Sequence, residues 1–239
     1  LQSSLSDDDY FHLFEKTYVK YNSRPDSKVR VLLSPGNVHW TSDYFLRRVK
    51  EYAKKYGTGI HLHLLESYYQ KLYAMKTWGK TPLAHLKDLE FLGPEVSYAH
   101  AVWLTEPDIR LLAEYGGSVC HNPSSNLRLK SGIAPVNPML RYGINVAIGT
   151  DSDGINDDDD MVQEMRMVAK LHRQPGIGAP AINSGQLLKM ATINGASPSF
   201  FGDHIGALEP GMRADMVLMD LSRIEEPYLD PNIHILDAL

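Results

Sequence analysis

The residues best suited to chemistry begin with two histidines and a carboxylate in the stretch GIHLHLLE. The two-residue period of a β-strand places His61 and His63 on one face of this stretch and apolar residues on the other. Glu66 follows just past the predicted strand. Further along, YAH ends with His100 and GTD ends with Asp151, each at the end of another predicted strand. Imidazoles and a carboxylate are typical ligands of Zn²⁺ and related divalent ions.

These positions predict a single site, because the active sites of parallel α/β proteins lie at the carboxyl ends of their strands. His63, His100 and Asp151 are the predicted ligands, and Glu66 is free to move protons. Simpler interpretations apply to single members. A lone strand histidine such as His61 is most often a hydrogen-bonded core residue, and Glu66 can also serve in a structural salt bridge.

The elements that must position these residues alternate between strand and helix from about residue 28 to 151. β-rich runs start near residues 29, 59, 95, 118 and 145. Helical patterns cover residues 7–22, 42–57, 82–92, 105–117, 133–143, 157–174 and 183–195. This alternation predicts βα units with parallel pairing. Five parallel strands form either an open doubly wound sheet or the last five strands of an eight-stranded barrel, and the polar residues must decide.

Composition bounds the function classes. The chain has 239 residues, 43% of them hydrophobic, and a net charge of −5, so a nucleic-acid partner is not expected. The single cysteine, Cys120, excludes an internal disulfide and suits a reducing cytoplasm. No apolar run has the ~20 residues of a membrane span, so no membrane partner is expected. The chain starts with Leu1 rather than Met, which predicts an internal piece of a longer gene product.

Five segments resemble the amidohydrolase superfamily, and most closely its branch of cytosine, guanine and S-adenosylhomocysteine deaminases and triazine hydrolases. In chain order they are HLHLLES, AHAVWLTEPDIRLLAEYGGSVCHNPSSNLRLKSGIAPV, GINVAIGTDSDGIND, LLKMATINGA and IGALEPGMRADMVLMD. The resemblance implies an α/β fold: a TIM-like (β/α)₈ barrel, of which residues 1–204 carry strands four to eight. It implies that residues 205–239 start a small β-sandwich domain. A β-hairpin is expected over residues 205–221.

The resemblance also implies roles for the strand-end residues. His63 and His100 would be metal ligands, Asp151 a further ligand that accepts a proton from water, and Glu66 the acid/base that protonates a ring nitrogen. His100 would also polarise the attacked centre. The implied cofactor is one divalent ion, Zn²⁺ or alternatively Fe²⁺. The implied reaction uses water on a small heterocyclic substrate: deamination of a purine, pyrimidine or related ring, or alternatively loss of chloride or an alkylamine from a triazine.

Two departures from the family pattern stand out. The family carries an H-x-H pair on its first strand, and no strand precedes residue 28 here, so two ligands are missing. An inactive scaffold that dimerises through barrel helices is therefore a second hypothesis, and a homodimer is expected in either case. The deaminase relatives also place a substrate-contacting histidine after the fourth-strand proline, where this chain has Gly36. His39 and Trp40 are then candidate substrate-binding residues, or simply part of a surface loop.

Three more residues are candidate substrate contacts. His121 and Asn126 lie in the seventh-strand motif, and Asn156 follows Asp151 closely. As alternatives, the asparagines are turn formers or helix caps. Cys120 is expected to be a small buried residue rather than a nucleophile, because no base pattern accompanies it.

Overall fold

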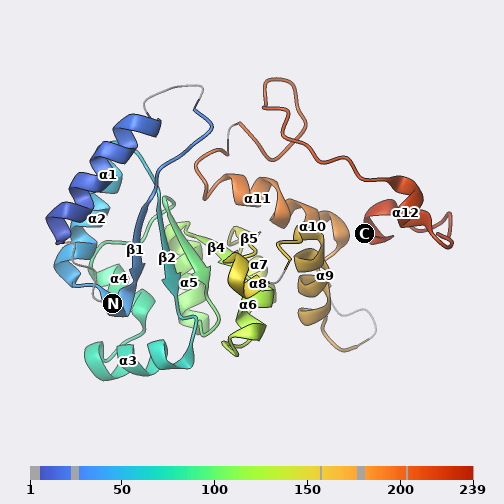
Figure 1. Cartoon of the computed structure of the whole chain (residues 1–239). Coiled ribbons are helices and arrows are strands. Elements are labelled where there is room, and N and C mark those ends of the chain that lie inside the picture. The colour runs from blue at the N-terminus through green and yellow to red at the C-terminus, as the bar shows by residue number, and fades with distance from the viewer. Residues whose placement is uncertain (1–5, 23–26, 157, 177–180, 203, 239) are drawn as a thin grey trace.

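The protein is built on one sheet of five parallel strands with helices between them (Figure 1). The computed structural model describes residues 6–22, 27–156, 158–176, 181–202 and 204–238, without the side chains of Asp153 and Asn156. The strands are β1 (Leu33–Asn37), β2 (Ile60–Leu64), β3 (Val96–His100), β4 (Ser118–His121) and β5 (Val146–Ile148).

The helices cluster between strands and after β5. Up to β4 they are α1 (Asp7–Asn22), the 3₁₀ turn η1 (Val38–Trp40), α2 (Asp43–Tyr56), α3 (Tyr68–Trp78), α4 (Pro82–Asp88) and α5 (Glu106–Tyr115). After β4 they are α6 (Pro123–Arg128), α7 (Val136–Arg141), α8 (Asp153–Asn156), α9 (Met161–Leu171), α10 (Ser184–Ala191), α11 (Ile193–Ala196), α12 (Leu221–Glu225) and α13 (Ile235–Ala238).

The strand order distinguishes a barrel segment from a doubly wound sheet. The order is β1-β2-β3-β4-β5, so each strand pairs with the next one along the chain. A doubly wound sheet reverses direction at a switch point, whereas a (β/α)₈ barrel proceeds in one direction. The sheet is open, because within the described residues β1 and β5 each pair on one side only. The architecture is therefore a run of barrel βα units without closure.

The two faces of the sheet differ as the strand period predicts. In β2, Ile60, Leu62 and Leu64 are at most 1% exposed, and they join the hydrophobic core with α2. His61 and His63 alternate with them and are only partly buried. The polar face is therefore the one turned away from the core.

The helices next to β1 are joined by aromatic side chains. Figure 1 shows α1 alongside α2 at the β1 end of the sheet. The ring centroids of Phe11 and Tyr52 lie 4.3 Å apart, and the Tyr18 hydroxyl donates to the Tyr56 carbonyl at 2.5 Å. These contacts attach the first helix, which lies where the amphipathic pattern of residues 7–22 predicts it.

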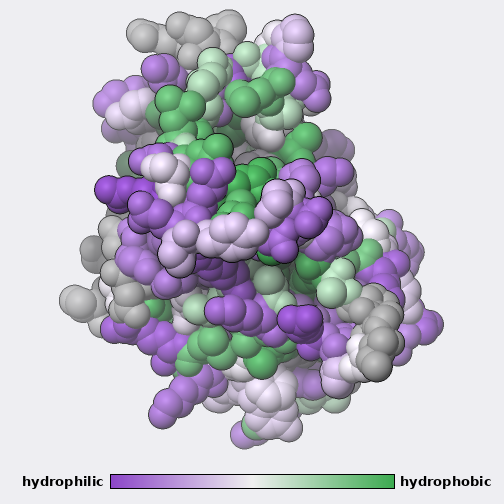
Figure 2. All heavy atoms as spheres, turned by 90° about the vertical axis from the view of Figure 1, so that its right-hand side faces the viewer, coloured by the Kyte–Doolittle hydropathy of each residue, from purple (hydrophilic) through white to green (hydrophobic). Residues whose placement is uncertain are grey.

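The C-terminal segment differs from expectation. The predicted hairpin over residues 205–221 does not form, since the described residues from 204 to 238 contain no strand. Val217 and Leu218 are 81% and 91% exposed, and Figure 2 shows apolar side chains among polar ones on the face that carries this segment. A two-stranded hairpin is marginally stable unless it packs against something, which explains the irregular backbone. The domain division at residue 205 stays a prediction.

Two helices and one boundary also differ. α3 and α6 form where the sequence predicted no helix, and β1 begins at Leu33 instead of near residue 29. In the part of the chain that the structure covers, no helix combines the length and apolar character needed to cross a membrane.

One core residue yields a stability prediction. Tyr98 on β3 is fully buried, and its hydroxyl has no hydrogen-bond partner among the described residues. Because a buried unsatisfied hydroxyl costs about 1–3 kcal/mol, Tyr98→Phe should raise the free energy of unfolding by about 1 kcal/mol. Urea denaturation measures this. Tyr18→Phe is the matched control and should lower stability, because the Tyr18 hydroxyl is bonded. A comparable loss in both variants would contradict the prediction.

Candidate active site

Two imidazole rings lie face to face at the carboxyl ends of neighbouring strands. The centroids of His63 and His100 are 5.5 Å apart, with 12° between the ring planes. The Nδ1 atom of His63 lies 2.8 Å from the carbonyl oxygen of Gly36, and the Nδ1 atom of His100 lies 2.9 Å from Oδ1 of Asn126. The Gly36 carbonyl can only accept, so Nδ1 of His63 carries the proton. With the Asn126 amide oriented oxygen toward the ring, Nδ1 of His100 takes the same role. The Nε2 atoms are therefore left with lone pairs, as a metal ligand requires.

The strand ends at this site have unusual backbone conformations. Leu65, His100 and Asp151 have φ values of 47°, 71° and 65°, in the left-handed region. His100 pairs in register with Leu64, a core residue, so strict alternation would turn its side chain away from His63. Leaving the extended conformation lets the His100 ring stack on His63. Each such residue costs on the order of 1–3 kcal/mol, and such strain is concentrated at functional sites.

Asp151 completes the predicted set. Its Oδ2 atom lies 3.9 Å from Nε2 of His100 and accepts a hydrogen bond of 2.5 Å from the Ser125 hydroxyl. Two ligand atoms bound to one Zn²⁺ at about 2.0–2.2 Å are roughly 3.4 Å apart in a tetrahedral site and at most about 4.3 Å apart. The Asp151–His100 distance falls inside this limit and is wider than the tetrahedral spacing.

The chemical types of these donor atoms suit a divalent ion, but the side chains do not converge closely around one point. Two imidazole nitrogens with lone pairs and one carboxylate suit Zn²⁺ or Fe²⁺. Yet within the described ranges no three His, Cys, Asp or Glu side chains converge tightly enough to hold an ion. His63, His100 and Asp151 are thus brought to one edge of the sheet but do not make a finished metal centre by themselves.

Glu66 and His39 lie on the β1 side of these rings. The Glu66 backbone N–H donates to Oε1 of Gln70 at 2.9 Å. Burial lowers the pKa of His39, and the nearby Glu66 carboxylate partly opposes this. The carboxylate is therefore close enough to act electrostatically in this corner of the site.

Aromatic rings extend the same corner. The His39 ring contacts Trp40, Tyr69 and Tyr73, with centroids 5.1–5.8 Å apart. The Trp40 ring lies 6.3 Å from that of His63 and is 72% exposed. The structure thus places an open aromatic surface next to a predicted ligand.

Gly36 explains the departure in the fourth-strand motif. It has a φ of 82°, in the left-handed region. This left-handed conformation favours glycine over histidine. The carbonyl of Gly36, rather than a side chain, then serves the site by holding His63.

The comparisons with known proteins identify the family of this chain. The model of the amidohydrolase family matches residues 20–237. The chain belongs to the amidohydrolase family. The fold of this amidohydrolase is the parallel α/β arrangement of its barrel-like structural neighbours, here without closure.

Three proteins illustrate which members of the family this chain is similar to. The chain is 40% identical over 204 residues to a 5'-deoxyadenosine deaminase of Methanosarcina mazei, covering 85% of this chain and 46% of that protein. A zinc-bound adenosine deaminase from Xanthomonas campestris superposes with a TM-score of 0.90 at 34% identity, covering 97% and 52% of the two chains. The zinc complex of atrazine chlorohydrolase from Arthrobacter aurescens gives 0.83 at 26%, covering 90% and 48%. The chain thus spans about half the length of each.

The remaining predicted residues lie at different places in this amidohydrolase. Asn126 is 1% exposed and contacts His100, a predicted ligand, and a substrate contact by Asn126 stays a prediction. His61 is a hydrogen-bonded interior histidine, with Nδ1 2.8 Å from the Ser97 hydroxyl. Burial is the largest cause that lowers the pKa of His61, and the neighbouring His63 and His100 lower it further. The side chain of Asn156 falls outside the described residues, so that expectation is unchanged.

His121 lies between the sheet and a helix. It is 1% exposed, and its Nε2 atom lies 3.0 Å from Nε2 of His172, the residue directly after α9. The strand period explains this placement, because Cys120 and His121 point to opposite faces of β4. Substrate contact by His121 therefore stays a prediction without a direct path in this structure.

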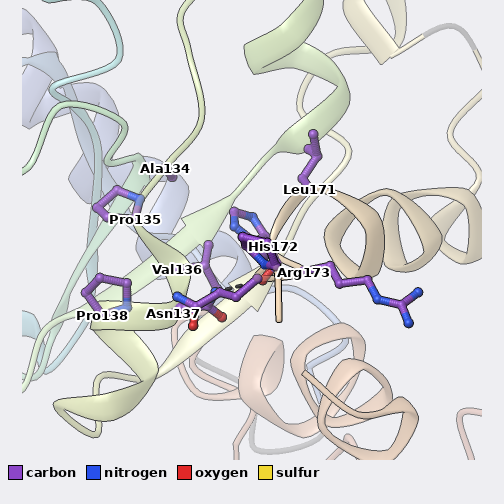
Figure 3. A pocket seen from close by; sticks show the side chains of 10 residues that line it. Ala134, Pro135, Val136, Asn137, Pro138, Leu171, His172 and Arg173 are labelled. Carbon is purple, nitrogen blue, oxygen red and sulfur yellow. Dashed lines mark hydrogen bonds between the residues drawn. The ribbon is translucent and has the colours of Figure 1, made fainter. Parts of the chain in front are cut away.

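His172 was not found from the sequence and lines a separate cavity of about 180 Å³ between α7 and the end of α9 (Figure 3). The Nδ2 group of Asn137 donates to the His172 carbonyl at 2.7 Å. The only sequence signal was a histidine at a helix end, which usually indicates favourable charge at the helix terminus. A buried contact between two imidazoles has no local pattern.

The buried pair predicts a pH dependence of stability. Burial lowers the pKa of His121 to about 3 and that of His172 to about 4, so both are neutral when folded. Unfolding restores pKa values near 6.5, so the unfolded chain binds more protons as pH falls. The stability that they contribute is present above pH ~6.5 and is lost below it, by up to about 1.4 kcal/mol per pH unit for each proton.

Urea denaturation between pH 4.5 and 7 measures this slope. His172→Gln removes one titrating group and should flatten the dependence by up to one proton. The exposed His12→Gln change is the matched control and should leave the slope unaltered. Equal slopes in the wild type and His172→Gln would contradict the assignment.

Proposed function

We propose that the full-length protein is a metal-dependent deaminase of an aminated purine, with an adenosine-type nucleoside as the first candidate. The observation that supports this most strongly is the stacked pair His63 and His100, whose Nδ1 atoms are engaged and whose Nε2 atoms are available beside Asp151. The names of the relatives point to the same substrate class.

In this proposal His63, His100 and Asp151 hold one divalent ion, Zn²⁺ first and Fe²⁺ second. A bound divalent ion supplies a water of lowered pKa and polarises the attacked group. The Asp151 carboxylate accepts a proton from the attacking water, and the Ser125 hydroxyl keeps that carboxylate oriented. Glu66 gives a proton to a ring nitrogen, and Asp151 passes the proton taken from water to the amine, which leaves as ammonia. Glu66 then recovers a proton from the added hydroxyl as the ring carbonyl forms. His100 is also proposed to polarise the attacked centre.

Substrate contacts are proposed for the aromatic corner. The Trp40 face is exposed and next to His63, so a flat heterocycle can stack on it. His39 is kept largely neutral by burial, so it is suited to accept or donate a hydrogen bond. His121, Asn126 and Asn156 remain candidate contacts of lower rank, because no described contact directs them toward an open site.

Two alternatives compete with this proposal. A triazine-type hydrolase uses the same water activation, and the likeness to atrazine chlorohydrolase supports it. An inactive scaffold is supported by the incomplete enclosure of the ligands. We also propose a homodimer in a reducing, cytoplasmic compartment; Cys120 is the single cysteine of the sequence, which fits a compartment where disulfides are rare.

A substrate panel tests the proposal. Full-length protein, loaded with zinc, should release ammonia from adenosine or 5'-deoxyadenosine, and a chelator should abolish the release. A coupled glutamate dehydrogenase assay measures ammonia, and ion chromatography measures chloride from atrazine. Chloride release alone would favour the triazine alternative. Neither product from a zinc-containing protein would favour the scaffold.

Two substitutions separate proton transfer from metal binding. Glu66→Gln should cut turnover by ~10²-fold or more and leave zinc content unchanged, because it removes only the proton donor. Asp151→Ala should lose both zinc and turnover. Turnover and zinc content are measured on the same samples, with the exposed Glu114→Gln as control. Full turnover in Glu66→Gln would remove that residue from the mechanism, and zinc retained in Asp151→Ala would contradict its role as a ligand.

A further inference from the structure

Three consecutive residues at the start of α6 each bind a different side chain from another part of the chain. The pairs are Ser124 with Glu164, Ser125 with Asp151, and Asn126 with His100. Two of these pairs reach predicted metal ligands. The third reaches Glu164 on α9.

Glu164 supplies what the start of α6 lacks. The preceding residue, Asn122, makes no capping hydrogen bond with its side chain, and Pro123 has no backbone N–H. The first free donor is the Ser124 N–H, which donates to Oε2 of Glu164 at 3.2 Å, while the Ser124 hydroxyl donates to Oε1. A carboxylate from a separate helix thus takes the place of a local cap.

Burial makes this contact strong and specific. Glu164, Ser125 and Asn126 are each at most 1% exposed. A fully buried carboxylate is rare unless it is well partnered, and its hydrogen bonds are worth more there than at the surface. α9 is itself fixed, since Asp160 caps its start and His172 contacts His121 at its end. Glu164 therefore holds α6 from a rigid support.

We propose that Glu164 is a positioning residue, which fixes Ser124 so that Ser125 and Asn126 hold Asp151 and His100 in the orientation that binds the metal. The inference rests on the proposed function, because it takes His100 and Asp151 as ligands. In this proposal Glu164 acts on the site through its contact with Ser124 in α6. Loss of its contact would let the start of α6 shift and would loosen two ligands together.

The test is the zinc affinity of the full-length protein, measured by competition with a chromophoric chelator. Glu164→Leu removes both acceptors and should weaken zinc binding by about 10-fold or more, as loss of outer contacts to metal ligands commonly does. Glu164→Gln keeps one acceptor for Ser124 and should lose less. Ser124→Ala combined with Glu164→Leu should lose little more than Glu164→Leu alone, because both changes break one contact.

A stability-matched control distinguishes positioning from general loosening. Leu46→Ala creates a cavity in the core between α2 and β1, where it should cost about 2–5 kcal/mol. Urea denaturation shows whether Leu46→Ala and Glu164→Leu are destabilised to the same midpoint. With stability matched in this way, the zinc affinity of Leu46→Ala should stay within about 2-fold of the wild-type affinity. An equal loss of affinity in Leu46→Ala, or wild-type affinity in a folded Glu164→Leu protein, would overturn the inference alone. A wild-type protein that binds no zinc would overturn the proposed function and this inference with it.

Discussion

The site depends on the tautomers of two imidazole rings. His63 and His100 can offer Nε2 to a common point only if Nδ1 holds the proton and donates it elsewhere. The acceptors come from other βα units: the carbonyl of Gly36 in β1 holds the histidine of β2, and Asn126 in α6, which follows β4, holds the histidine of β3. The parallel register, in which Asn37 pairs with His63, is what makes the first of these contacts possible. The arrangement of the strands therefore determines which nitrogen of each imidazole carries the proton, as well as where the ring lies.

Much of the fold was predictable from periodicity. The strand at GIHLHLLE showed its two faces in the alternation of His61 and His63 with apolar residues, and the structure has the same alternation of burial. α1 and α2 lie where amphipathic patterns and end signals placed them. α3 was missed because its aromatic, charged and apolar residues are spread around the helix without a clear stripe. The hairpin failed because strand formation depends on a partner, which local sequence cannot supply.

The sequence identified which residues belong to the candidate site better than it predicted how they are arranged. Strand ends identified His63, His100 and Asp151, and the structure brings them to one edge. Alternation alone would have turned His100 away, and only its left-handed backbone corrects this. The contacts of Ser125, Asn126 and His172 join residues 26–51 positions apart in the chain, so no local pattern reveals them. Polar contacts between residues far apart in the chain can therefore be identified only from the three-dimensional structure.

The left-handed residues at the strand ends also bear on protein engineering. Ala101 has a φ of 49°, a conformation that glycine adopts without steric penalty. Glycine there would relieve local strain, and it would also widen the range of directions open to the neighbouring His100. Attempts to raise thermal tolerance at this edge would therefore exchange precision of the reactive groups for resistance to heat. Thermostabilising substitutions are better sought on the opposite, amino-terminal edge of the sheet.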